Sequence, residues 1–164
     1  MSHALLISGA GIAGLAAALA LSRAGARVDV VERAPQLSTE GAGVQLGPNV
    51  TRILRAWGLQ DALNAVAVFP QHLCARDARD GRVMGQVALS TGAQRYGAPH
   101  VCIHRADLQM LLWHAAQQER HIHWHWGQAL QSVNPTADHV SVRSEAGQTW
   151  SAHGLVVAEG IGSP

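Results

Sequence analysis

The sequence predicts an α/β fold built on a parallel β-sheet, with a small antiparallel β piece attached. Two observations lead to this fold class. Residues 4–32 predict a buried strand, a glycine-rich turn, a helix and a second strand, which is the crossover unit that joins parallel strands. Residues 73–89 and 134–150 each predict two short strands joined by turn residues, RDGR in the first and EAGQ in the second, a pattern typical of antiparallel hairpins.

The composition is that of a compact cytoplasmic protein. Hydrophobic residues make up 48% and charged residues 14% of the 164 residues, which argues against a disordered chain. The formal net charge is +1 without any Lys/Arg stripe, so we expect no nucleic-acid partner. No apolar run approaches the ~20 residues that span a bilayer, and no signal peptide or membrane contact is expected.

The sequence predicts a single domain with two unpaired cysteines. Cys74 and Cys102 lie far apart and outside any CxxC motif, so we expect buried thiols in a reducing compartment. Because no repeat or low-complexity linker interrupts the sequence, residues 1–164 are expected to form one domain.

Each element of the crossover unit has its own signal. Residues 4–7 form a short apolar run that predicts the first strand. A helix rich in Ala and Leu is expected over residues 12–24, with Gly25 as its C-cap. Residues 27–31 are rich in valine and predict the second strand, which ends at Glu32.

Gly9, Gly11 and Gly14 have the GxGxxG spacing of a dinucleotide-binding turn. Gly9 permits a tight turn, Gly11 lets the backbone approach a pyrophosphate, and Gly14 lets the helix pack close to the sheet. The N–H groups of Ile12 and Ala13 have no partner within the helix, and the helix dipole there favours an anion. The turn therefore predicts a site for the diphosphate of a dinucleotide.

Glu32 is placed to accept hydrogen bonds from the ribose hydroxyls of an adenosine. Its carboxylate would repel a 2′-phosphate, which argues against NADP, although Arg33 beside it is a residue type that holds such phosphates. FAD and NAD share the adenosine diphosphate half, so this unit alone leaves both cofactors open.

A second glycine-rich segment follows. Gly41 and Gly43 suit a loop whose backbone comes close to a flat ligand. Pro48 suits the first turn of a helix that Gly58 ends. The apolar residues at helical spacing in this helix are Val50, Ile53, Leu54 and Trp57.

Arg105 begins another predicted helix, in which Leu108, Leu111 and Leu112 share one face. A cation at this position could reach a pyrophosphate or the edge of a flavin. From the residues alone, a solvated surface arginine is the simpler interpretation.

Three further segments resemble landmarks of a known family. They are EGAGVQLGPNVTRILRAWGL at 40–59, IHRADLQMLL at 103–112 and LVVAEGIGSP at 155–164. With the glycine turn, they resemble in type and order the FAD-dependent aromatic hydroxylases, the single-component flavoprotein monooxygenases typified by salicylate and hydroxybenzoate hydroxylases. The resemblance implies the N-terminal part of a Rossmann-like FAD-binding fold of the glutathione-reductase type, with residues 70–100 as a β-rich insertion that begins the substrate-facing sheet.

The resemblance also implies a cofactor site and a reaction. NAD(P)H would reduce FAD, and one atom of O₂ would be transferred to a small aromatic substrate of the phenolic acid type. Because the cofactor carries out the difficult chemistry, the resemblance names no catalytic side chain, and the sequence shows neither a triad nor paired carboxylates. The residues that would hold FAD are Gly9, Gly11, Gly14, Glu32, Arg33 and Arg105, with the backbone near Val44 and Gln45 beside the isoalloxazine ring and the backbone near Ala129 beside the adenine.

The sequence departs from the family pattern at two points. Glu159 precedes Gly160 where the family has Asp-Gly, so a contact or strand-end cap suited to Asp could be lost. The sequence stops at Pro164, where family members continue, so we expect uncovered apolar surface and self-association. Two alternatives stay open, namely a non-catalytic FAD- or nucleotide-binding fragment and, with less support, an NAD-dependent oxidoreductase module.

HIHWHW at 121–126 alternates with the period of a strand. His121, His123 and His125 would share one face and point to solvent, while the apolar side chains between them face inward. The third histidine would lie roughly 13 Å from the first along an extended strand. One metal ion cannot bind all three, and no metal site is predicted.

Overall fold

The computed structural model describes residues 4–38 and 40–161, which form two compact units. The first unit draws on the chain before residue 40 and from residue 112 onward, and the second comprises residues 40–111. The boundary at residue 112 falls inside a helix, α5 (Arg105–Gln117), rather than in a linker. A division of this kind leaves no compositional signal, and the sequence predicted a single domain.

The first unit is built on a four-stranded parallel sheet with the order β11-β1-β2-β7. Its strands are β1 (Ala4–Ser8), β2 (Arg27–Glu32), β7 (Ile122–Trp126) and β11 (Gly154–Val157). Every neighbouring pair is parallel, which confirms the predicted fold class. Because β1 lies between β2 and β11, the turn that follows β1 meets the ends of both neighbours at one edge of the sheet.

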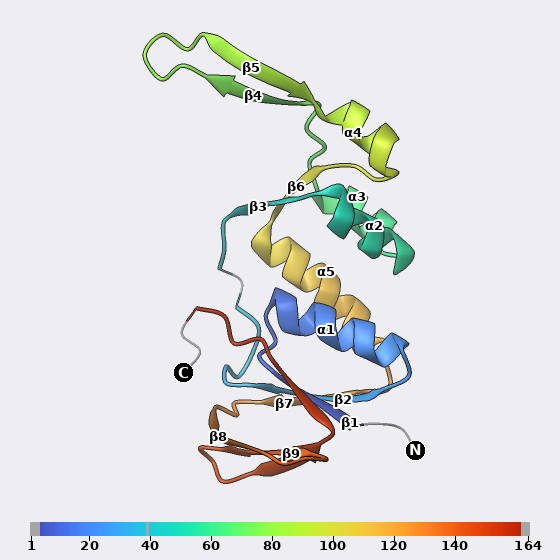
Figure 1. Cartoon of the computed structure of the whole chain (residues 1–164), viewed down its shortest axis with the longest axis vertical. Helices are drawn as coiled ribbons and strands as arrows, with labels where there is room; N and C mark the ends of the chain where they lie inside the picture. Colours follow the sequence, from blue (N-terminus) through green and yellow to red (C-terminus); the bar gives the residue numbers. More distant parts are fainter. Residues whose placement is uncertain (1–3, 39, 162–164) are drawn as a thin grey trace. The chain divides into compact units, whose positions relative to one another are not determined.

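Helix α1 (Ile12–Arg23) lies against one face of this sheet (Figure 1). It is the predicted helix, and Gly25 ends it in the left-handed region with a φ of +89°. The same face carries Trp124 and Trp126 of β7, which contact Trp113 of α5 edge-on at centroid distances of 4.6 and 5.5 Å.

A three-stranded antiparallel sheet covers the opposite face (Figure 1). It consists of β8 (Leu130–Pro135), β9 (Val140–Ser144) and β10 (Thr149–Ala152), in the order β10-β9-β8. The sequence predicted the hairpin of β9 and β10 within residues 134–150, but it did not predict β8. The core between the two sheets is formed by Leu6, Val31, Val140, Val142 and Ala152.

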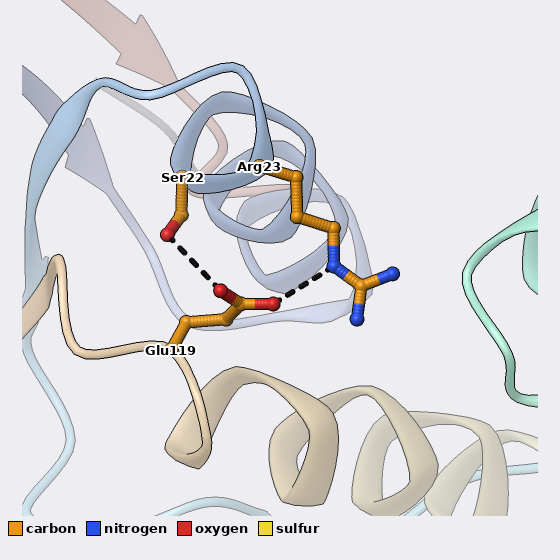
Figure 2. A network of polar contacts seen from close by, with 3 residues as sticks. All are labelled: Ser22, Arg23 and Glu119. Atoms are coloured by element: carbon orange, nitrogen blue, oxygen red, sulfur yellow. Dashed lines mark hydrogen bonds and ion pairs between the residues drawn. The ribbon is translucent and has the colours of Figure 1, made fainter.

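A polar network fixes the C-terminal end of α1 (Figure 2). The Glu119 carboxylate accepts a hydrogen bond from Arg23 Nε at 2.8 Å and a longer one from Ser22 Oγ at 3.5 Å. Glu119 lies in the turn between α5 and β7, so the network joins the end of α1 to the start of β7. Because Arg23 and Glu119 are partly exposed, we expect this ion pair to contribute at most about 1 kcal/mol.

The second unit contains two small antiparallel sheets and three short helices. Strands β3 (Gly43–Leu46) and β6 (Val101–His104) form one sheet, and β4 (His72–Arg76) and β5 (Val83–Ala88) form the predicted hairpin. The helices are α2 (Pro48–Ala56), α3 (Gln60–Val66) and α4 (Leu89–Tyr96). Helix α4 directly follows the hairpin (Figure 1). The sequence did not predict it, because the Ser-Thr-Gly run within it is typical of turns.

The prediction that both cysteines are buried is wrong. Cys74 lies on β4, where every residue is exposed, and Cys102 on β6 is only half-buried. Ile53 of α2 is 47% exposed, whereas its neighbour Leu54 is buried. Every residue of β4 and of its partner β5 is exposed, so no other element in the described part of the chain covers the hairpin and Cys74 stays exposed.

The helices of the described residues are short. None of them combines the length and the apolar character needed to cross a membrane.

Candidate cofactor site

The turn after β1 requires a glycine at its first position. Gly9 has a φ of +100°, and its N–H donates to the carbonyl of Val31 on β2 at 2.8 Å. A Cβ on Gly9 would lie 2.5 Å from the carbonyl oxygen of Ala158, just after β11. Backbone from three neighbouring strands therefore meets at Gly9 with no room for a side chain.

Gly14 is required for a related reason. A Cβ at this position would lie 1.8 Å from the carbonyl oxygen of Gly9, and the side chain of Ile7 is at an ordinary contact distance of 3.5 Å. The sequence predicted that Gly14 lets the helix pack close to the sheet. The tightest contact is instead with the glycine turn itself, so Gly14 and Gly9 form one packed pair.

Gly11 differs from the other two glycines. A Cβ on Gly11 would meet no atom within 4 Å, and its backbone is in an ordinary extended conformation with φ −69° and ψ −177°. It is the N-cap of α1, where no side chain caps the helix and no acidic residue lies in the first turn. Ile12 is half-buried and Ala13 is exposed. The N–H groups at this helix end are therefore open to an external anion.

Glu32 is held in place beside the turn by two backbone donors. Its Oε2 accepts a hydrogen bond from Ala10 N–H at 2.6 Å, and its Oε1 accepts one from Ala34 N–H at 2.8 Å. Each carboxylate oxygen has a second lone pair, so the group can also accept hydrogen bonds from a diol. The turn and the carboxylate are thus joined into one preorganised cluster.

The segment after β7 lies against the end of β2. Gln128 N–H donates to the carbonyl of Glu32 at 2.9 Å, and the Gln128 side-chain oxygen Oε1 is buried without a partner among the described residues. A buried acceptor without a donor is unfavourable, and ligand donors commonly satisfy such groups. Nothing in the sequence distinguished Gln128, because its position next to Glu32 depends on the pairing of β2 with β7.

Two other predicted residues lie in the same region. The side chain of Arg33 is exposed. The carbonyl of Ala129 accepts a hydrogen bond from Glu145 N–H at 2.9 Å, so any cofactor contact of Ala129 must use another backbone atom or its second lone pair.

Glu159 keeps a role as a strand-end cap. Its Oε1 accepts a hydrogen bond from the hydroxyl of Ser8, the last residue of β1, and Ala158 N–H donates to the carbonyl of Ser8 at 2.7 Å. Ser8 is buried. The longer side chain of glutamate therefore reaches the neighbouring strand, which answers the concern that a strand-end cap suited to aspartate is lost.

Arg105, Val44 and Gln45 belong to the second unit. Arg105 is half-buried, and its Nη1 donates to the carbonyl of Glu40 at 3.2 Å and to Gln109 Oε1 at 3.3 Å. A Cβ on Gly41 would lie 2.7 Å from Arg105 Cβ, so Gly41 accommodates the stem of this arginine. Arg105 is thus a positioned side chain rather than a freely solvated one.

Val44 and Gln45 lie on β3 and pair with Ile103 and Cys102 on β6. Val44 is half-buried and Gln45 is exposed. Unlike Gly41, Gly43 at the start of β3 has open space in the direction of a Cβ. The flat-ligand explanation for the glycines of this loop therefore stays a prediction for Gly43, whereas Gly41 is explained by the stem of Arg105.

The histidine-rich strand has the predicted alternation, but one histidine is not directed to solvent. His125 is half-buried: its Nε2 lies 2.8 Å from Asp29 Oδ1, and its ring contacts Trp150 at a centroid distance of 5.3 Å. The antiparallel sheet covers this face, which the strand pattern alone could not reveal. Within the described ranges, no group of three or more His, Cys, Asp or Glu residues is arranged to hold a metal ion.

Comparisons with known proteins place the chain in a family. Residues 2–164 match the family of FAD binding domains. The chain is 34% identical to 3-hydroxybenzoate 6-hydroxylase of Klebsiella oxytoca, covering 94% of this chain and 39% of that protein. It is 34% identical to 6-hydroxynicotinate 3-monooxygenase of Pseudomonas fluorescens, covering 99% of this chain and 42% of that protein.

A solved structure agrees with these relatives. HpxO of Klebsiella pneumoniae, in complex with FAD and uric acid, superposes with a TM-score of 0.79 at 27% identity, covering 93% of this chain and 38% of that one. The chain belongs to the FAD binding domain family, which confirms the resemblance found in the motifs. It spans about 40% of the length of the curated relatives that it matches.

Alanine substitutions at Gly14 and Gly11 should affect the stability of the protein to different extents. Gly14→Ala should lower the free energy of unfolding by about 1–3 kcal/mol, because its Cβ cannot fit against the Gly9 carbonyl. Gly11→Ala should change it by less than about 0.5 kcal/mol, since a slightly poorer N-cap is offset by a less flexible unfolded chain. Urea unfolding followed by tryptophan fluorescence measures both. Equal stability of the two variants would contradict the packing described for Gly14.

Proposed function

We propose that this chain is the FAD-binding part of a flavoprotein monooxygenase that hydroxylates a small aromatic substrate of the phenolic acid type with NAD(P)H and O₂. The observation that carries the proposal is the open space at Gly11, at an uncapped helix end beside a fixed carboxylate. Packing within the chain explains the glycines at positions 9 and 14 but not the one at 11. A ligand that must come close to the backbone explains the glycine at position 11.

Different residues of the first unit would contact the diphosphate and the ribose of the adenosine diphosphate half of FAD. The N–H groups of Ile12 and Ala13 would donate to the diphosphate, and Glu32 would accept hydrogen bonds from the ribose hydroxyls. Gln128 adds a buried acceptor next to Glu32. The backbone near Ala129 beside the adenine, and a contribution of Arg33, stay predictions from the family resemblance.

The residues of the second unit stay predictions as well. Arg105 would provide a cation toward the cofactor, and the backbone of Val44 and Gln45 would lie beside the isoalloxazine. Support for Arg105 comes from the two hydrogen bonds that hold its guanidinium and from the absence of a side chain on Gly41. The bound flavin would supply the oxygen-transfer chemistry, and the protein orients the flavin and excludes water.

The substrate class follows the names of the relatives, which act on 3-hydroxybenzoate and 6-hydroxynicotinate. Both are single aromatic rings with a hydroxyl and a carboxylate group. A cytoplasmic location also stays a prediction, and its support is that both cysteines are free thiols.

FAD titration of the purified 164-residue protein tests the cofactor site. We expect saturable binding, detected by quenching of flavin fluorescence and by a bound-flavin absorption spectrum. Gly11→Ala should weaken binding at least about tenfold, since its Cβ occupies the space that the diphosphate requires. Gly11→Asp should abolish binding through bulk and charge.

Gly85→Ala is the matched control for this titration. Gly85 also has open space around a Cβ, but it lies on the β4–β5 hairpin. The control should bind FAD like the unmodified chain. If the chain binds no FAD, or if Gly11→Asp binds it unchanged, the proposal is wrong.

Glu32 should exclude nucleotides that carry a 2′-phosphate. In competition with FAD, AMP should bind at least about tenfold more tightly than 2′,5′-ADP, which is AMP with an added 2′-phosphate, because the carboxylate held by Ala10 and Ala34 repels the added phosphate. Displacement of bound FAD measures both affinities without any mutation. Equal or tighter binding of 2′,5′-ADP would show that Arg33, rather than Glu32, determines recognition at the ribose.

Self-association through uncovered apolar surface is part of the proposal. Its support is one face of the β4–β5 hairpin, where Leu73, Val83 and Val87 are 56%, 45% and 59% exposed. Sedimentation velocity should show concentration-dependent association that Leu73→Lys reduces. A monomer at every concentration would exclude it.

A further inference from the structure

The second unit contains a hollow of about 300 Å³ between the start of α2, the end of β5, helix α4 and the loop before β6. This is near the lower limit for small-molecule sites, and an apolar cavity of about half that volume holds a benzene ring. The hollow therefore has room for a single substituted ring. Its lining residues are Pro48, Val87, Ala88, Leu89, Thr91, Gly92, Arg95, Tyr96 and His100.

The lining combines apolar surface with a cation. Pro48, Val87 and Leu89 supply aliphatic surface, and the Arg95 guanidinium lies over the Tyr96 ring at 5.5 Å from its centroid. None of the lining residues is acidic, and Arg95 forms no ion pair with any residue in the described part of the chain. An arginine held on an aromatic face keeps its N–H groups available for a planar anion.

Gly92 shows that helix α4 leaves this hollow open. It lies in the middle of α4 with ordinary helical backbone, and a Cβ there would meet no atom within 4 Å. Glycine lowers the stability of a helix by about 1 kcal/mol relative to alanine, and nothing in the described packing requires it at this position. A glycine in a helix that lines an open hollow is explained if the space in front of it accommodates a ligand.

We propose that this hollow binds a single-ring aromatic carboxylate. The ring would lie against Pro48, Leu89 and Tyr96, in the space left by Gly92, and the carboxylate would accept paired hydrogen bonds from Arg95. His100 is a second potential donor on the same lining. The biological role, recognition of the substrate's carboxylate, rests on the proposed function, whereas the binding itself requires no FAD.

The chain offers a specific probe for this site. Tyr96 is its sole tyrosine, so a protein labelled with 3-fluorotyrosine gives one ¹⁹F resonance at the hollow. Titration with benzoate should move this resonance in a saturable way. Benzamide, which has the ring without the charge, and acetate, which has the charge without the ring, should each bind at least about tenfold more weakly.

Two variants and one control assign the binding to this hollow. Gly92→Leu fills the space while raising helix propensity, so it should stay folded and lose the benzoate response. Arg95→Gln should weaken benzoate binding at least about tenfold and leave the weak response to benzamide unchanged. Arg79→Gln removes an exposed arginine from the hairpin loop, outside the lining, and should bind benzoate like the unmodified chain.

The outcomes separate this inference from the FAD proposal. A saturable benzoate response that Gly92→Leu abolishes and Arg95→Gln weakens at least about tenfold supports the site, whether or not the same sample binds FAD. FAD binding without any saturable benzoate response overturns the inference and leaves the cofactor proposal intact. A benzoate response that persists in Gly92→Leu, with the circular dichroism spectrum unchanged, also overturns it, because the ligand would then bind elsewhere.

Discussion

The close approach of backbone segments at the glycine turn is the constraint on which the rest of the first unit depends. Gly9 lies against the carbonyl of Ala158, and Gly14 lies against the carbonyl of Gly9. Two neighbouring strands and the first turn of α1 therefore meet without any side chain between them. This contact sets the position of α1 on the sheet and directs the free N–H groups of its N-terminus beyond the edge of the strands.

The electrostatic features of the site follow from that packing. Glu32 ends the neighbouring strand, so its carboxylate comes within hydrogen-bond distance of the turn and is fixed there by Ala10 and Ala34. The Glu159 carboxylate accepts a hydrogen bond from the side-chain hydroxyl of Ser8 at the end of β1. Backbone donors and strand-end side chains thus preorganise the site, which is an advantage in binding a large cofactor. Gly11 is the one glycine of the turn that packing leaves unexplained, and it therefore indicates a ligand most directly.

The second unit is organised differently. Both strands of its hairpin are exposed at every residue, and helix α4 has no buried residue. Its ordered polar features are local, such as Arg105 held against Gly41 and the Arg95–Tyr96 pair in the hollow. A two-stranded hairpin has little stability of its own in water. The apolar residues on its surface are therefore exposed rather than part of a core.

The sequence by itself determined the elements whose signals are local. The strand, turn and helix of the GxGxxG unit, the C-cap at Gly25, the 72–88 hairpin and the buried leucine face of α5 all depend on residues close together in the chain. Only the tertiary structure decided which glycines are required by packing, that Gln128 lies beside Glu32, and that Arg105 is held by Glu40 and Gln109. It also decided that His125 is half-buried, that Cys74 is exposed and that the chain divides within α5. Those features depend on which distant strands pair and which faces are covered, and spacing along one chain does not encode them.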